Sequence, residues 1–275
     1  MPKLYDDLIN IIDFVPDKDE ELKTEKYFKT LEAIGNFYTN FIPLMVLFVL
    51  FLYWFGGVGG CLLYVVFLIV CITIYKRYKS SNKARMERIM AGCDLNKMLT
   101  EFIVMARFVR GTKGAESLLP SISYVLYYMG KFDEAKKVIN LVCKHCNTLV
   151  GNAHRLFLYT IIARREMDKE SEEQYIRELE KLMTQVNTPV LIKAYENICK
   201  YPLIMEAEEN GDYSKALELM EEYENENLLA KVSRNYGLYK IAKNAGLEAE
   251  TSKHRAFVLE HGGDTFYKRE LEGVG

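Results

Sequence analysis

The feature that most constrains the fold is a long stretch without charge, interrupted by four glycines. No Asp, Glu, Lys or Arg occurs from Ala33 to Tyr75. Two almost continuously apolar blocks, residues 41–55 and 61–75, flank the sequence GGVGG at residues 56–60. Glycine destabilises a helix interior by roughly 1 kcal/mol relative to alanine and frees the backbone for a tight turn. The pattern therefore predicts two apolar helices joined by a turn.

The composition of this helical hairpin predicts that lipid surrounds it. Core helices of soluble domains usually retain a polar stripe, and neither block has one. With their uncharged flanks, the blocks give two expected transmembrane spans, at about residues 37–55 and 58–75. Each is close in length to the hydrocarbon thickness of a bilayer. A hairpin buried in the core of a soluble protein is the alternative.

Basic residues at both ends of the hairpin predict its orientation. Lys and Arg are retained on the cytoplasmic side of a membrane, and the glycine turn carries none. We therefore expect a multi-pass integral membrane protein with both termini cytoplasmic. The basic residues after the second span are expected to contact anionic lipid headgroups: Lys76, Arg77, Lys79, Lys83, Arg85 and Arg88. A nucleic-acid partner is not expected, because its groove would need aromatic residues among the basic ones over a larger face.

This interpretation divides the chain into four parts. An N-terminal cytoplasmic helical segment, residues 1–36, precedes the hairpin of residues 37–75. A basic juxtamembrane linker, residues 76–94, leads into a cytoplasmic helical domain, residues 95–275. Within the first part, residues 4–15 are nearly amphipathic, and they are expected either to pack on the helical domain or to lie along the membrane.

The C-terminal part has the pattern of successive helices joined by short turns, so the predicted fold class is all-α. Apolar residues recur at helical spacing from Leu95, and Asp94 precedes them as an N-cap. The expected turns between paired helices lie at Gly130, near residues 167–169, at Gly211 and at Gly246. Pro202 is expected to break residues 190–210 into two pieces, because proline removes a helical hydrogen bond.

Two of these turns share a short motif of glycine, a polar residue, an aromatic residue and a later alanine. The matching residues are Gly130-Lys131-Phe132 with Ala135, and Gly211-Asp212-Tyr213 with Ala216. The motif resembles the turn between the two helices of a tetratricopeptide repeat. That resemblance implies an α-solenoid of four helix pairs over roughly residues 95–261, whose concave face binds extended peptides. A generic stack of antiparallel helix pairs is the alternative.

The expected concave face provides the candidate binding groove for a protein partner. Its side chains are aromatic, apolar or basic: Tyr124, Tyr127, Tyr128, Tyr201, Met205, Tyr236, Lys240 and Lys243. An ordinary packing role for the tyrosines and a solvated role for the lysines are the alternatives at each position.

No arrangement of residues indicates catalysis or a bound cofactor. Cys143 and Cys146 lie one helical turn apart, but a structural zinc site needs four ligands, and the chain has no second CxxC. The GGVGG sequence lacks the lysine that follows a phosphate-binding loop. We therefore expect a protein without enzymatic activity, cofactor or metal.

The functional hypothesis combines the hairpin with the helical domain. It is a membrane-anchored scaffold or adaptor that presents a helical-repeat domain for protein–protein interaction at the cytoplasmic membrane face. The alternative is an accessory subunit of a larger membrane complex, for transport or secretion, in which the hairpin makes the specific contact.

Overall fold

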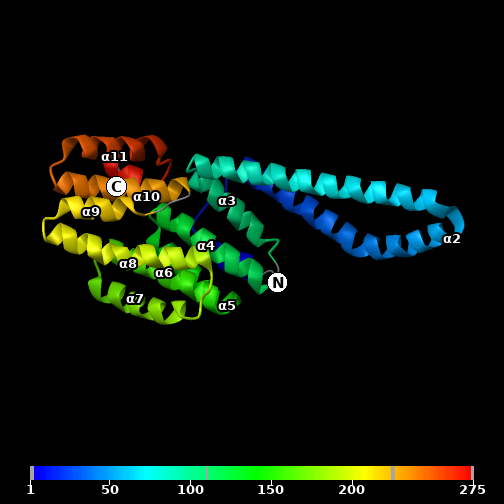
Figure 1. Ribbon diagram of the computed structural model, residues 1–275, viewed down its shortest axis with the longest axis horizontal. Helices are drawn as coiled ribbons and strands as arrows, with labels where there is room; N and C mark the ends of the chain where they lie inside the picture. Colours follow the sequence, from blue (N-terminus) through cyan, green and yellow to red (C-terminus); the bar gives the residue numbers. More distant parts are fainter. Residues whose placement is uncertain (1–2, 110, 224–226, 274–275) are drawn as a thin grey trace. The chain divides into compact units, whose positions relative to one another are not determined.

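The protein is all-α, as the sequence predicts. The computed structural model describes residues 3–109, 111–223 and 227–273; the side chain of Lys3 and many side chains between residues 35 and 86 lie outside the described set. Within these ranges the chain forms helices α1 to α12 with connecting turns, and no β-strand is present (Figure 1). The chain divides into two compact units: residues 18–88 form one, and residues 1–17 together with 89–275 form the other.

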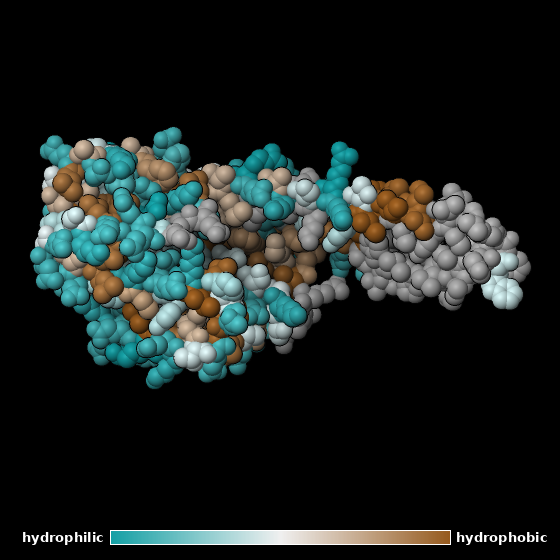
Figure 2. All heavy atoms as spheres, viewed as in Figure 1, coloured by the Kyte–Doolittle hydropathy of each residue, from teal (hydrophilic) through white to brown (hydrophobic). Residues whose placement is uncertain are grey.

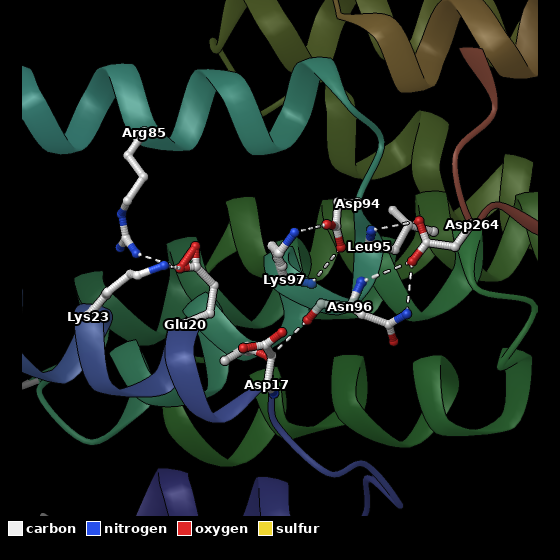
Figure 3. A network of polar contacts seen from close by, with 10 residues as sticks. Asp17, Glu20, Lys23, Arg85, Asp94, Leu95, Asn96, Lys97 and Asp264 are labelled. Carbon is white, nitrogen blue, oxygen red and sulfur yellow. Dashed lines mark hydrogen bonds and ion pairs between the residues drawn. The ribbon is translucent and has the colours of Figure 1, made fainter. Parts of the chain in front are cut away.

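The smaller unit consists of residues 18–88 of helix α2 (Lys18–Ala91), which folds back on itself (Figure 1). A straight helix of this length would extend roughly 110 Å, yet the guanidinium of Arg85 lies 3.4 Å from the carboxylate of Glu20. The same guanidinium donates to the Thr24 hydroxyl at 3.2 Å. Lys23 adds an ion pair to Glu20 at 3.7 Å (Figure 3). The two ends of α2 are therefore side by side.

The prediction of two transmembrane spans requires correction. In the part of the chain that the structure describes, no helix combines the length and the apolar character that a bilayer crossing demands. The expectation of a multi-pass integral membrane protein with both termini cytoplasmic is accordingly wrong. Each apolar block is shorter than the roughly 20 residues of a span, and the expected spans at 37–55 and 58–75 were completed only with glycine and polar flanking residues. Most side chains of residues 37–75 lie outside the described set.

The second half of α2 exposes a row of aliphatic side chains. They form the hydrophobic patch visible on this helix in Figure 2 and comprise Val65, Val66, Ile69, Val70, Ile72 and Ile74. Nothing in the described part of the chain covers them.

The larger unit contains four helix pairs preceded by one helix. The first helix is α3 (Leu95–Ala106), and Asp94 caps it as predicted, since its carboxylate accepts from the backbone N–H of Lys97 at 3.0 Å. The pairs are α4 (Thr112–Tyr128) with α5 (Phe132–His145), α6 (Leu149–Arg165) with α7 (Lys169–Met183), α8 (Pro189–Glu209) with α9 (Tyr213–Glu221), and α10 (Leu228–Asn244) with α11 (Glu248–His261). Within each pair the two helices make the most extensive contacts in the unit.

The turn inside each pair lies where the sequence predicts it. Gly130, Gly211 and Gly246 adopt positive φ angles of 76°, 72° and 70°. Glycine reaches such angles without steric cost. Met167 makes the remaining turn with a φ of 61°. A non-glycine residue therefore accepts the left-handed conformation there, which is uncommon.

The prediction that Pro202 breaks its helix is wrong. Helix α8 continues through Pro202 to Glu209. Proline has no N–H to donate to the carbonyl four residues earlier, which belongs to Ile198. The guanidinium of Arg164 on α6 donates to that carbonyl instead, at 3.3 Å. A neighbouring helix therefore satisfies the group that proline leaves unpaired.

The N-terminal segment packs on this helical unit. Leu4 and Leu8 of α1 (Lys3–Ile9), and Ile12 beyond it, are buried. The carboxylate of Asp7 accepts from Lys144 at 2.7 Å and lies 2.7 Å from the ring of His145. The sequence left open whether this segment packs on the helical domain or lies along a membrane, and the structure shows it packed on the helical domain.

The C-terminal helix closes the array by returning to its first helices. Helix α12 (Phe266–Glu272) places Phe266 against the turn at Gly130, and Arg269 donates to the backbone carbonyl of Met129 at 2.6 Å. The preceding Asp264 accepts from the N–H groups of Leu95 and Asn96, at 3.2 and 3.3 Å (Figure 3). An open solenoid has two free ends, whereas here the last element is bonded to the first.

Candidate functional site

A cavity of about 490 Å³ lies within the helical unit. The first helices of the four pairs, α4, α6, α8 and α10, provide most of its wall, and Tyr267 of α12 joins them. Side chains three and four positions apart lie on the same face of a helix. This spacing explains why Tyr124, Tyr127 and Tyr128 all reach the cavity from α4.

Six of the eight predicted groove residues line this one cavity. They are Tyr124, Tyr127, Tyr128, Tyr201, Tyr236 and Lys240. Met205 and Lys243 lie outside it. Met205 lies closer to the turn at Gly211 than Tyr201 does, and Lys243 lies closer to the turn at Gly246 than Lys240 does. The Nζ of Lys243 lies over the ring of Tyr239, 5.9 Å from the ring centroid.

An aromatic cluster centred on Tyr267 forms one side of the cavity. Its ring centroid lies 4.8 Å from that of Tyr236, and its hydroxyl lies 2.9 Å from Ser233 Oγ and 3.4 Å from the hydroxyl of Tyr127. Burial raises the pKa of Tyr127 and of Tyr267 above the usual phenol value. These phenols therefore remain neutral at physiological pH and act as hydrogen-bonding groups.

Three further tyrosines line the cavity. Burial raises the pKa of Tyr124, Tyr128 and Tyr201, which keeps each hydroxyl protonated. Among the described residues, none of these three hydroxyls has a hydrogen-bond partner. Each of these hydroxyls can donate one hydrogen bond.

Two arginines of α6 are neutralised by carboxylates. Arg164 pairs with Glu172 at 2.8 Å, and its guanidinium stacks on the ring of Tyr201 at 3.6 Å. Arg165 pairs with Glu270 of α12, and that carboxylate also accepts from the hydroxyl of Tyr236. Neither glutamate lines the cavity.

Two cations on α10 have no such partner. Arg234 donates from Nη1 to the backbone carbonyls of Tyr223 at 3.1 Å and of Glu221 at 3.4 Å, and its buried Nε has no acceptor among the described residues. Lys240 is exposed and makes no ion pair with any described residue. No acidic residue occurs among the described residues of the lining, whereas Arg234 and Lys240 both belong to it.

The basic residues expected to contact lipid headgroups occupy different environments on α2. Lys76, Arg77, Lys83 and Arg88 are exposed. Arg85 is half-buried and bonded to Glu20 and Thr24, so it serves the packing of α2 on itself. The side chain of Lys79 lies outside the described set.

The cysteine pair at the end of α5 forms no metal site with the other described residues. Cys143 is exposed, whereas Cys146 is half-buried and its thiol donates to the carbonyl of Val142 at 3.4 Å. Burial raises the pKa of the Cys146 thiol, which disfavours the thiolate that metal binding requires. The described residues contain no cluster of three or more His, Cys, Asp or Glu suited to a metal ion.

Sequence reasoning missed the arginines and Tyr267. Arg164 and Arg165 end an apolar helix, where basic residues are common for reasons of helix polarity. Tyr267 is separated by 140 positions from Tyr127, so no local pattern connects them. Arg234 lies on the same helix as Lys240, and this was the available signal for it.

Comparison with known proteins gave no match: no family model fits the chain, and neither a curated protein nor a solved structure is similar to it.

Proposed function

We propose that this protein is an interaction scaffold whose cavity in the helical unit holds a segment of a partner protein. The observation that carries the proposal is the cavity of about 490 Å³, lined by the first helices of all four pairs. Its volume lies within the range of natural ligand sites, about 300 to 1,000 Å³. In this proposal the four pairs form a tetratricopeptide-like array, and their first helices form its binding face.

The chemistry of the lining suits binding of a polypeptide. Tyrosines and arginines are the residues that dominate binding energy at protein interfaces. The wall combines apolar side chains, such as Phe157 and Ile161, with Tyr124, Tyr128 and Tyr201, whose hydroxyls have no hydrogen-bond partner among the described residues. A bound segment would bury its apolar side chains against the former and hydrogen-bond to the latter.

The test is a cavity-filling substitution in the full chain. Ile161→Trp places an indole into the cavity from α6, while Ile192→Trp, on α8 and outside the lining, introduces the same side chain elsewhere. Partners cross-linked to the wild-type chain in native extracts and identified by mass spectrometry should be lost from Ile161→Trp and retained by Ile192→Trp. Retention of every partner by both variants, with unchanged circular dichroism, would refute the proposal.

A second candidate function follows from the exposed aliphatic row on α2. An accessory subunit of a larger assembly would use such a surface for its specific contact, since contiguous exposed apolar patches mark interaction sites. Val66→Glu with Ile69→Glu should then release the protein from its assembly. Ile161→Trp should leave that assembly intact, which separates the two functions.

A further inference from the structure

The end of the cavity that contains Arg234 and Lys240 shows which kind of segment would fit it. Arg234, Gly237 and Lys240 of α10 all line this end of the cavity. The side chain of Met220 fills the space beside Gly237, since a Cβ at position 237 would lie 2.8 Å from its Cε.

Arg234 has no carboxylate partner among the described residues. Its Nη1 is bonded to two backbone carbonyls, and its Nε, which has no partner among these residues, is buried away from the accessible surface. A carboxylate is the acceptor that matches a guanidinium best. Lys240 adds a second positive charge to the lining. An anionic group would therefore complete this end of the site.

The protein itself contains an example of the chemistry that this wall binds. Helix α12 presents an aromatic residue and an acidic residue three positions apart, Tyr267 and Glu270, to the cavity wall. Tyr267 packs on Tyr236, and Glu270 is bonded to Arg165 and to the hydroxyl of Tyr236. The wall thus binds an aromatic–acidic pair through an arginine and a tyrosine on its α6–α10 side.

We infer that the partner segment carries an acidic side chain three or four residues from an aromatic one, with its carboxylate bound between Arg234 and Lys240. This inference rests on the proposed function. The aromatic side chain lies among the rings of Tyr124, Tyr128 and Tyr201, whose hydroxyls remain available to its backbone carbonyls. Arg164 does not take part in binding the carboxylate, because Glu172 already neutralises it.

The experiment selects peptides from a library of random segments. Each segment is fused to a carrier protein at both of its ends, so that no peptide has a free terminal carboxylate that could replace an acidic side chain. The bait is the purified full chain. Enriched sequences should contain Asp or Glu three or four positions from Phe, Tyr or Trp. In fluorescence polarisation, Arg234→Gln and Lys240→Gln should each raise the Kd of the selected peptide at least about tenfold. Lys243→Gln, on the same helix but outside the lining, should change it by less than about twofold.

The outcomes separate this inference from the proposed function. If Ile161→Trp blocks the selected peptides while Arg234→Gln and Lys240→Gln bind them like the wild type, the proposed function stands and the acidic–aromatic segment is refuted. Enrichment of peptides without acidic residues refutes that segment in the same way. If no peptide is enriched, or a small anion is found bound in native mass spectrometry, both are refuted. Lys240 is exposed, so its substitution leaves folding intact even if Arg234→Gln does not.

Discussion

Alanine at two equivalent turns should report on the closure of the helical unit. Gly130 and Gly211 make the turns of the first and third helix pairs with φ angles of 76° and 72°. A Cβ at position 130 would lie 3.1 Å from Cβ of Phe266 and 3.3 Å from Nη2 of Arg269, both on α12. A Cβ at position 211 would meet nothing within 4 Å. The two substitutions therefore share their backbone strain and differ only in the contact with α12.

The expected magnitudes follow from that difference. A left-handed conformation costs a non-glycine residue roughly 1 to 2 kcal/mol, and both variants incur it. Gly130→Ala also forces an extra carbon into a packed contact, which costs about 1 to 3 kcal/mol. The free energy of unfolding should therefore fall by about 2 kcal/mol more for Gly130→Ala than for Gly211→Ala.

Urea unfolding of the full chain measures this difference. The near-ultraviolet circular dichroism of the buried tyrosine cluster follows the helical unit. With a slope of about 1 to 3 kcal/mol per molar urea, the two midpoints should differ by roughly 1 M. Equal midpoints for the two variants would show that α12 does not lie against the turn at Gly130, and the closure of the helical unit would then be incorrect.

Three further predictions test individual contacts. A double-mutant cycle of Pro202→Ala with Arg164→Met should show a coupling of about 1 kcal/mol in urea unfolding. The reason is that alanine at position 202 restores the N–H that bonds the Ile198 carbonyl, so this carbonyl no longer needs Arg164. Additive effects of the two substitutions would show that Arg164 does not compensate for Pro202. Burial lowers the pKa of His154 from 6.5, so the unfolded form binds a proton first as the pH falls below that value. Stability should decline from there by at most about 1.4 kcal/mol per pH unit. The stability of His154→Gln should decline less steeply over the same pH range. An unchanged dependence of stability on pH would show that His154 does not cause the decline. Asp264→Ala should lower stability in thermal unfolding by about 1 to 2 kcal/mol. Asp264→Asn should lose less, because its single amide oxygen can still accept from one of the two N–H groups, so that equal losses would argue against a role for these hydrogen bonds.

Local signals in the sequence explain which parts of the fold could be predicted. A glycine between two helical patterns requires only its neighbours to be interpreted, and Gly130 and Gly211 lie at the expected turns. Pro202 misled for the opposite reason, because the donor that compensates it belongs to Arg164 on another helix. The two transmembrane spans were expected because the apolar blocks reach the length of a span when their uncharged flanking residues are included. This expectation was wrong, since no helix in the described part of the chain is long and apolar enough to cross a bilayer.

The candidate site could be predicted only in part for the same reason. The tyrosines of the first helices were identifiable because helix periodicity places them on one face. The distinction between Arg164 and Arg234 depends on Glu172 and on the carbonyls of residues 221 and 223, none of which the pattern around either arginine indicates. Tyr267 enters the cavity through a long-range contact that periodicity does not encode.

The bond between Asp264 and the start of α3 also bears on how the helical unit unfolds. Linear repeat arrays lose their terminal repeats first, because each repeat is supported only by its neighbours. Here both terminal elements support each other, so neither is a preferred starting point for fraying. Amide hydrogens of the first and last pairs should consequently exchange with solvent as slowly as those of the middle pairs, through a single cooperative opening.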